Sequence, residues 1–516
     1  MDSHFRGNDN HVILTFETAS FYVIDFYPKF QQQKMILKSI KQFLFFYLIL
    51  SASQLSLSQE RNKVLDDYLS DYLIIKNVPS ISAGLLKDGK IIWLGTIGFS
   101  DLENNVPATN NSVYRIASIS KPITAVSILQ LWEKGLINLD ADVKSYLPDF
   151  PAKKWKFTIR QLLSHTSGIR NYKEGEFDSK KFYSSIDEAI KVFEFDSLDF
   201  EPGTKYEYTS LDYTLLAAIV EKVSKTDFEN YLKNNVFLPA GMKVTRIDNQ
   251  REIIPNRVRG YEKNAERKFV NAPLADLSIK IAGGGLVSTV EDLLQFSKAL
   301  LENKLLQPST LEMMTRKTKL KNGKEIDIGL GFFLEFENDS LKYFSHIGAG
   351  TGFSSMLIIN PKLKIASVNL INIRDRNLGT PAKELLEIFS SGKIIVPTKT
   401  LSDVLMKTYL ASGIDSSIQR LKNIYKNEQS FFVLNEKEGI YFANDLIELN
   451  RISDAITYLK ELNKLFPKSF QILVTIADAF LKDKNEGLAL RYYKNAAKLN
   501  KNNVRVNNLI KKLSYK

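Results

Sequence analysis

The chain has 516 residues, 44% of them hydrophobic and 25% charged, and its formal net charge is +12. These values are typical of a folded globular protein with more than one domain, and they argue against a disordered chain. The sequence contains no cysteine, which excludes disulfides, thiolate metal sites and lipid-modified cysteine anchors.

The N-terminal segment has the pattern of an export signal. Residues 35–41 form a short basic start, residues 43–50 are an unbroken apolar run, and residues 51–59 offer a small-residue cleavage region. The apolar run is shorter than the ~20 residues of a membrane span. We interpret residues 1–34 as a doubtful extension ahead of a true start at Met35. The expectation is a periplasmic or extracellular protein, and membrane contact would follow only if the signal stays uncleaved as an anchor.

A hairpin and a helix are predicted next along the chain. Residues 80–85 and 91–97 are β-rich, and the Asp88-Gly89 pair between them favours a tight hairpin turn. The following helix is expected to open near Ser118 and to stop at Gly135. Ser118 would then lie at a helix N-terminus, where free N–H groups favour developing negative charge.

Ser118 and Lys121 are three positions apart, so on a helix they share one face. A lysine amine beside a hydroxyl can take its proton if burial or neighbours control the lysine charge. The sequence gives little support for a zinc hydrolase or for a serine activated by histidine. His165 and His346 are the only histidines beyond the N-terminal segment, they lack zinc-hydrolase spacing, and no G-x-S-x-G elbow occurs. An S-x-x-K match in isolation is nevertheless weak, because most such pairs lie on solvated helix faces.

Two later clusters precede regular elements. Residues 201–210 form a Pro-Gly turn that leads into a helix with an apolar stripe over residues 211–223. Residues 344–353 are glycine-rich, and two apolar strands follow at residues 355–360 and 365–371. Taken alone, residues 201–210 would be a turn followed by a helix cap. A lone histidine such as His346 in residues 344–353 would more often be structural than catalytic.

Taken in order, these clusters resemble the serine β-lactamase and penicillin-binding-protein superfamily, in its class-C-like, esterase-like or LACTB-like branch. The matching elements are Ser118-x-x-Lys121, Tyr208-Thr209-Ser210 and His346-Ile347-Gly348. Two further stretches, residues 158–169 and 282–293, look like the same family, and the resemblance covers about residues 60–395.

The resemblance implies an α+β fold, with an antiparallel sheet flanked by helices, an all-helical lobe, and the active site between them. It implies that Ser118 is the acylated nucleophile and that Lys121 and Tyr208 share the general-base work. The oxyanion hole would use backbone N–H groups of Ser118 and Ala349. Substrate-binding positions implied by the same motifs are His346, Gly348 and Ser210. No metal or cofactor is implied, and we expect His165 to be structural.

Two positions depart from the family pattern. Ser210 stands where many members have asparagine, and His346 stands where antibiotic-hydrolysing members usually have lysine. A neutral histidine offers a substrate carboxylate only a hydrogen bond, whereas lysine offers a permanent charge. The substitutions favour an esterase, an amidase or a peptidase acting on D-amino-acid peptides. A weak β-lactamase and a non-catalytic peptide-binding or scaffold protein remain the alternatives.

The C-terminal part is predicted to be helical. Residues 396–435 would be a connector, and residues 436–516 would be repeats, because Ala455 and Ala489 head matching segments 34 residues apart. That period resembles short tetratricopeptide tails. Residues 451–516 carry +9 of the net charge of +12. We interpret this as a solvated lysine-rich surface or as a docking site for an acidic envelope protein; no nucleic-acid motif is present.

Overall fold

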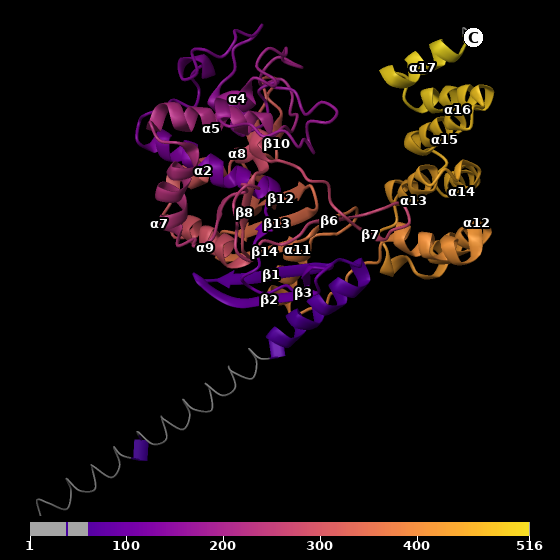
Figure 1. Ribbon diagram of the computed structural model, residues 1–516, viewed down its shortest axis with the longest axis horizontal. Coiled ribbons are helices and arrows are strands. Elements are labelled where there is room, and N and C mark those ends of the chain that lie inside the picture. Colours follow the sequence, from indigo (N-terminus) through magenta and orange to yellow (C-terminus); the bar gives the residue numbers. More distant parts are fainter. Residues whose placement is uncertain (1–37, 40–59, 515–516) are drawn as a thin grey trace, which may run out of the picture. The chain divides into compact units, whose positions relative to one another are not determined.

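The computed structural model describes residues 38–39 and 60–514 (Figure 1). Apart from residues 38–39, the predicted extension at 1–34 and the predicted signal at 35–59 lie outside the described residues. Within the described part, every helix is too short or too polar to cross a membrane. The chain divides into two compact units, residues 1–63 and 64–516, and the site lies in the second.

A seven-stranded antiparallel sheet forms the centre of this unit, as the α+β prediction requires. In spatial order the strands are β11 (Phe333–Glu337), β12 (Ser340–Gly350), β13 (Phe353–Asn360), β14 (Ile365–Ile371), β1 (Ser80–Lys87), β2 (Lys90–Asp101) and β3 (Val106–Pro107). The predicted β1–β2 hairpin is confirmed, and its turn residues Asp88 and Gly89 both have positive φ. Such a turn follows the twist of the paired strands.

Each face of the sheet carries its own hydrophobic core. Helix α9 (Val290–Leu301) and the β14 residues Val368 and Leu370 belong to the larger core. Helix α11 (Pro381–Ser391) and the helical residues 64–76 bury their apolar side chains in the other, together with Ile81 and Leu85 of β1. This division follows the alternation of side chains along a strand.

A helical lobe shares the larger core (Figure 1). Helix α2 (Ser120–Glu133) is buried from Ser120 to Leu131, so it packs on every side and has no solvent face. The lobe's other helices are α3 (Ile159–Leu163), α4 (Ile186–Ile190), α5 (Leu211–Ser224), α6 (Phe228–Leu232), α7 (Leu238–Ala240), α8 (Ile281–Gly284) and α10 (Pro308–Met314). The central position of α2 fixes the residues at its N-terminus with respect to both the sheet and the lobe.

Short strands connect these layers. They form the sheets β4 (Tyr114–Arg115), β8 (Leu286–Ser288) and β5 (Arg246–Ile247); β15 (Ile373–Arg374), β6 (Tyr261–Lys263) and β7 (Phe269–Asn271); and β9 (Thr318–Lys319) with β10 (Glu325–Ile326). Strand β4 leads directly into the Ser118 segment.

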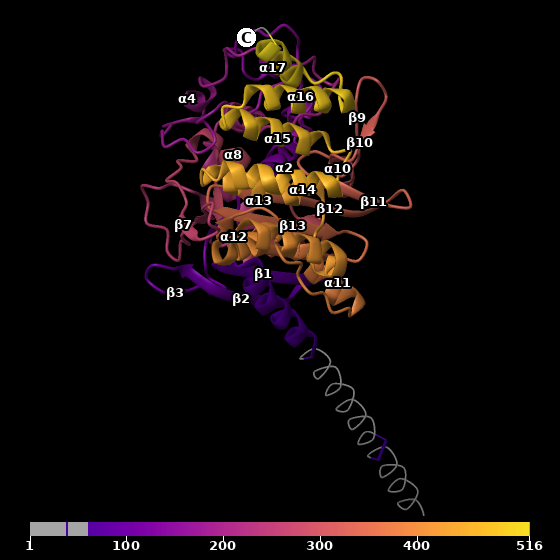
Figure 2. The same ribbon diagram turned by 90° about the vertical axis from the view of Figure 1, so that its right-hand side faces the viewer.

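The C-terminal part is helical and has a hydrophobic core of its own (Figure 2). Its helices are α12 (Leu401–Asn427), α13 (Glu436–Glu448), α14 (Ile452–Leu465), α15 (Phe470–Lys482), α16 (Glu486–Leu499) and α17 (Val504–Ser514). Helices α13, α15 and α17 begin at residues 436, 470 and 504, and α14 and α16 at 452 and 486, so equivalent helices are 34 residues apart. The tetratricopeptide assignment and the boundaries at 60–395, 396–435 and 436–516 stay predictions.

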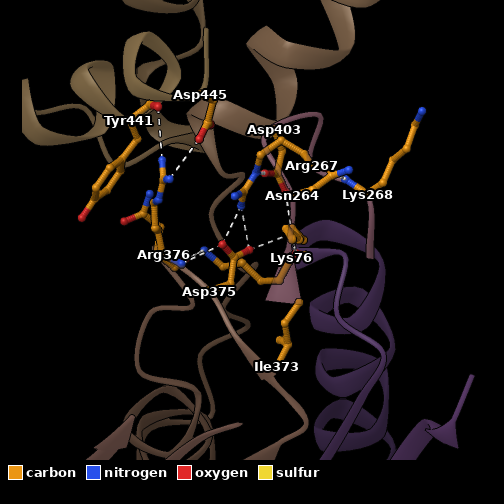
Figure 3. Close-up of polar contacts among 12 residues, drawn as sticks. Lys76, Asn264, Arg267, Lys268, Ile373, Asp375, Arg376, Asp403, Tyr441 and Asp445 are labelled. Atoms are coloured by element: carbon orange, nitrogen blue, oxygen red, sulfur yellow. Dashed lines mark hydrogen bonds and ion pairs between the residues drawn. The ribbon is translucent and has the colours of Figure 1, made fainter. Parts of the chain in front are cut away.

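A buried charge network joins this helical part to the sheet-containing part (Figure 3). Arg267 lies between Asp375 and Asp403, at 2.6 Å and 2.5 Å. Lys263 contacts the same two carboxylates at 2.8 Å each. Asp403 belongs to α12, whereas the other three side chains come from the β6–β7 hairpin and the end of β15.

Candidate active site

Ser118 lies in a short 3-10 turn, η1 (Ala117–Ile119), immediately before α2. Ala117 has φ +45°, a left-handed conformation that costs an alanine about 1–3 kcal/mol. The Nζ atom of Lys121 lies 3.2 Å from the Oγ atom of Ser118. The helical spacing read from the sequence therefore brings the two groups into hydrogen-bond contact.

Lys121 is fully buried, and its amine is held by two further partners. Nζ donates to Ser210 Oγ at 2.9 Å and to the Gly283 carbonyl at 2.6 Å. Burial, and then the positive charge of Lys280, hold the pKa of Lys121 well below its ordinary value, and Asp212 opposes them. A neutral amine has two N–H donors and one lone pair. Ser210 and Gly283 can take the donors, which leaves the lone pair for the Ser118 hydroxyl.

The Tyr208 ring lies against the same amine, with Nζ of Lys121 4.7 Å from its centroid. A hydrogen bond with Ser118 lowers the pKa of Tyr208, but burial outweighs it and raises this pKa well above its ordinary value. The phenol is therefore protonated at rest. His165 packs behind it, with the ring centroids 4.5 Å apart, and lies 3.2 Å from buried Asp212. This placement supports the tyrosine and matches the structural role expected for His165.

His346 projects from β12, with its ring centroid 6.2 Å from that of Tyr208. Its Nδ1 lies 2.9 Å from the Ile347 carbonyl. Because a carbonyl can only accept, Nδ1 carries the proton and Nε2 has the lone pair. Burial, and then the charge of Lys121, lower the pKa of His346 to about 3. The imidazole is neutral at physiological pH and supplies no positive charge here.

Strand β12 approaches η1 closely at Gly348. A Cβ atom there would lie 2.5 Å from the Ile116 carbonyl and 2.1 Å from Ser355 Oγ. Only glycine fits without displacing backbone. The next residue, Ala349, is exposed. The oxyanion hole built from the N–H groups of Ser118 and Ala349 stays a prediction.

We expect Gly348→Ala to destabilise the fold by about 1–3 kcal/mol, because the added methyl group overpacks the contact with the Ile116 carbonyl. Urea unfolding would measure the change. Gly487→Ala is a matched control, since nothing lies within 4 Å of a Cβ atom at this helical position. The control should be neutral or up to about 1 kcal/mol more stable. Equal stability of Gly348→Ala and wild type would contradict the close approach.

Several groups at the site were not predicted from the sequence. The Gly283 carbonyl and Asp212 act on Lys121, and Lys280 adds a second buried amine. Gly283 lies in the predicted 282–293 stretch, but nothing there indicated a carbonyl acceptor. Ser210 was expected to face substrate, and the structure adds a bond to Lys121. Within residues 60–514, no cluster of three or more acidic or histidine side chains could hold a metal ion.

Comparison with known proteins agrees with this geometry. The family model described as Beta-lactamase matches residues 65–387. The human mitochondrial serine beta-lactamase-like protein LACTB is 32% identical over 55% of this chain and 69% of its own length. Penicillin-binding protein 4* of Bacillus subtilis is also 32% identical, over 52% of this chain and 63% of its own. The solved D-amino acid amidase of Ochrobactrum anthropi SV3 has 24% identity and a TM-score of 0.57, covering 64% of this chain and 99% of that chain.

The matched residues include every element that carries Ser118, Lys121, Tyr208 and His346, and they end before the helical tail. The solved amidase shares the fold of the sheet and lobe. Because the family match spans more than half of the sequence, this chain belongs to the beta-lactamase family, with LACTB and penicillin-binding proteins among its relatives.

Proposed function

We propose that this chain is an exported serine hydrolase that forms an acyl-enzyme on Ser118 with an ester, amide or D-amino-acid peptide substrate. One observation carries the proposal: a buried amine of lowered pKa, Lys121, lies 3.2 Å from the Ser118 hydroxyl. A lysine with only a structural role has no need of a lowered pKa beside a serine hydroxyl. Export rests on the pattern of residues 35–59.

In the acylation step, the Lys121 lone pair takes the Ser118 proton while Oγ attacks the substrate carbonyl carbon. The carbonyl oxygen becomes an oxyanion, and the N–H groups of Ser118 and Ala349 are the donors that we propose to receive it. The tetrahedral intermediate collapses, and the bond from carbon to the leaving nitrogen or oxygen breaks.

The leaving group needs a proton as that bond breaks. Tyr208 is protonated at rest and contacts Ser118, so it can donate this proton and recover one from Lys121. Lys121 then takes a proton from a water molecule as that water attacks the acyl carbon, the bond from this carbon to Oγ breaks, and the proton passes to Oγ. The products are a free acid and the released amine or alcohol.

The assembled serine, lysine and tyrosine favour the alternative of a weak β-lactamase, whereas His346 argues against an efficient one. The serine, lysine and tyrosine are assembled, but His346 is neutral where a β-lactam carboxylate would require a cation. The missing cation would weaken binding of the β-lactam carboxylate, so acylation by penicillins should be slow. A binding-only role would leave the buried Lys121 amine without a function.

A fluorophosphonate probe tests the proposal, because Oγ of an activated serine displaces fluoride and keeps the phosphonyl group. We expect one adduct per chain by intact mass, located on Ser118 by peptide mapping. Ser118→Ala should remove it. Ser127→Ala should keep it, since that hydroxyl bonds only the Ile123 carbonyl of its own helix. A wild-type chain that takes no label, or a label that survives Ser118→Ala, would refute the mechanism.

A further inference from the structure

A pocket of about 410 Å³ lies beside the turn between β12 and β13. Its lining includes Arg115, Arg257 and Thr351. Arg115 precedes Ser118 by three residues, and Thr351 follows Ala349 by two. Three residues span at most ~10 Å. The pocket is therefore within reach of a substrate bound at Ser118.

The pocket lies on the acyl side of the scissile bond. Tyr208, which protonates the leaving group in the proposed mechanism, lies beside His346 on β12. From His346 the strand runs past Ala349 to Gly350, and the pocket begins at the turn beyond. The leaving group therefore occupies the His346 end, and the acyl part of the substrate extends toward Thr351.

The pocket has more guanidinium groups than carboxylates to neutralise them. Asp248 is shared by Arg115 at 2.7 Å and Arg257 at 2.8 Å. The pairing of residues 113 and 257 holds the two arginines on neighbouring backbone segments. The buried Nε atom of Arg257 has no hydrogen-bond partner among the described residues. A buried N–H without an acceptor is costly, so the Arg257 guanidinium has donor capacity that its contact with Asp248 does not use.

Two more cations extend the positive charge around Thr351. Lys280 and Arg374 lie over the same Phe177 ring, at 3.7 Å and 4.7 Å from its centroid. Asp178 bonds Thr351 and lies 3.6 Å from Arg374. Burial lowers the pKa of Lys280 to about 8, Asp178 opposes this, and the charges of Arg115 and Arg374 add to it. Arg374 and Lys280 therefore lie next to Asp178, which bonds Thr351 of the pocket lining.

We propose that this pocket is an acyl-side subsite in which Arg115 and Arg257 bind a carboxylate of the substrate. The inference rests on the proposed function, because it needs an acyl group on Ser118. The proposed subsite would supply positive charge on the acyl side, whereas histidine replaces the usual lysine at position 346 on the leaving-group side. The leaving-group side is neutral, whereas the acyl side is positive, so the enzyme would select an acidic acyl group instead of an acidic leaving group.

Esters of equal chain length and different charge test the proposal directly. Mono-p-nitrophenyl adipate, p-nitrophenyl hexanoate and p-nitrophenyl 6-aminohexanoate place a carboxylate, a methyl group and an ammonium group at the same distance from the carbonyl. We expect kcat/KM to be about tenfold higher for the adipate than for the hexanoate, and lowest for the amine. A peptide arm compares p-nitroanilides of acetyl-D-Glu-D-Ala and acetyl-D-Gln-D-Ala, which distinguishes a peptide source of the carboxylate from a diacid.

Arg257→Gln should reduce the adipate-to-hexanoate ratio to near one, and Arg257→Lys should keep most of it. Arg316→Gln is the matched control, since that exposed side chain, just past the end of α10, pairs with Glu312 of this helix, and it should keep the full ratio. Hydrolysis of all three esters without a preference for the anion would overturn the subsite alone, and so would a ratio that survives Arg257→Gln. No hydrolysis and no phosphonate adduct on Ser118 would overturn the proposed function and the subsite together.

Discussion

Replacing Lys121 by methionine is expected to lower kcat/KM for ester hydrolysis by roughly 10²- to 10⁴-fold, the usual contribution of a general base. Methionine keeps the length of the side chain but has no lone pair on nitrogen to take the Ser118 proton. Steady-state kinetics with a p-nitrophenyl ester would measure the loss, and thermal unfolding would show that the variant folds. Lys134→Met makes the same change at the exposed end of the same helix and should retain wild-type kinetics.

Lys121→Arg separates a base from a charge. An arginine stays protonated at every accessible pH, so it keeps a cation near Ser118 but cannot accept a proton. We expect it to be as inactive as the methionine variant. Activity within tenfold of wild type would show that the charge matters and that the base lies elsewhere.

The pH dependence of the wild type provides a second test of the same residue. The reactive form requires a deprotonated Lys121, so kcat/KM should fall as pH drops through its pKa. Because burial and Lys280 lower that pKa from its ordinary value of 10.5, the rate should reach its plateau well below pH 10.5. His346 titrates at about 3 and should not contribute near neutrality. If kcat/KM reached its plateau only above pH 10, the pKa of Lys121 would not be lowered.

The fold and the pairing of Ser118 with Lys121 could be predicted from the sequence because they depend on local patterns. Alternation of side chains and the Asp88-Gly89 turn define a hairpin regardless of what packs against it. The spacing of Ser118 and Lys121 is a property of one helical turn. The order of the motifs along the chain then supplied the fold class, which the family match and the antiparallel sheet confirm.

The electrostatic state of the site could not be predicted, because it depends on residues brought together from distant segments. Complete burial and Lys280, which is 159 positions along the chain, hold the pKa of Lys121 well below its ordinary value. Its amine is held by Gly283, a backbone carbonyl that no motif marks. Tyr208 is expected to share the base work, and the structure adds that burial raises the pKa of its phenol. Loop packing, such as that of Phe177 over Lys280, is equally non-local.

Arg267→Met is expected to destabilise the protein by about 3–5 kcal/mol, the usual consequence of removing one partner from a buried ion pair. Lys263 would be the one cation left in contact with Asp375 and Asp403, and Asp375 is 3% exposed. Urea unfolding followed by circular dichroism would measure the free energy. The effect should include release of the helical tail from the β6–β7 hairpin, because Asp403 lies in α12 (Figure 3).

The comparison that decides this prediction is with an exposed pair. Arg505→Met breaks the ion pair between Arg505 and Asp478, whose side chains are 60% and 35% exposed. This change should cost at most about 1 kcal/mol. The double variant Arg267→Met/Asp403→Leu should lose less than the sum of its single changes, because each single change leaves the four-charge network with one excess charge that the other change removes. Additive losses would show that the network is a set of independent contacts.

The pH range of this effect follows from the direction of the pKa shift. Burial would raise the pKa of Asp375, but the charges of Lys263 and Arg267 outweigh it and hold the pKa below its ordinary value. A carboxyl group with a lowered folded pKa stabilises the fold above its unfolded pKa of ~3.9, and that contribution is lost as pH falls through the folded value. The difference between wild type and Arg267→Met should therefore be constant from about pH 6 to 8 and shrink in acid. A difference that grows on acidification would show that the carboxylates are not held ionised by these cations.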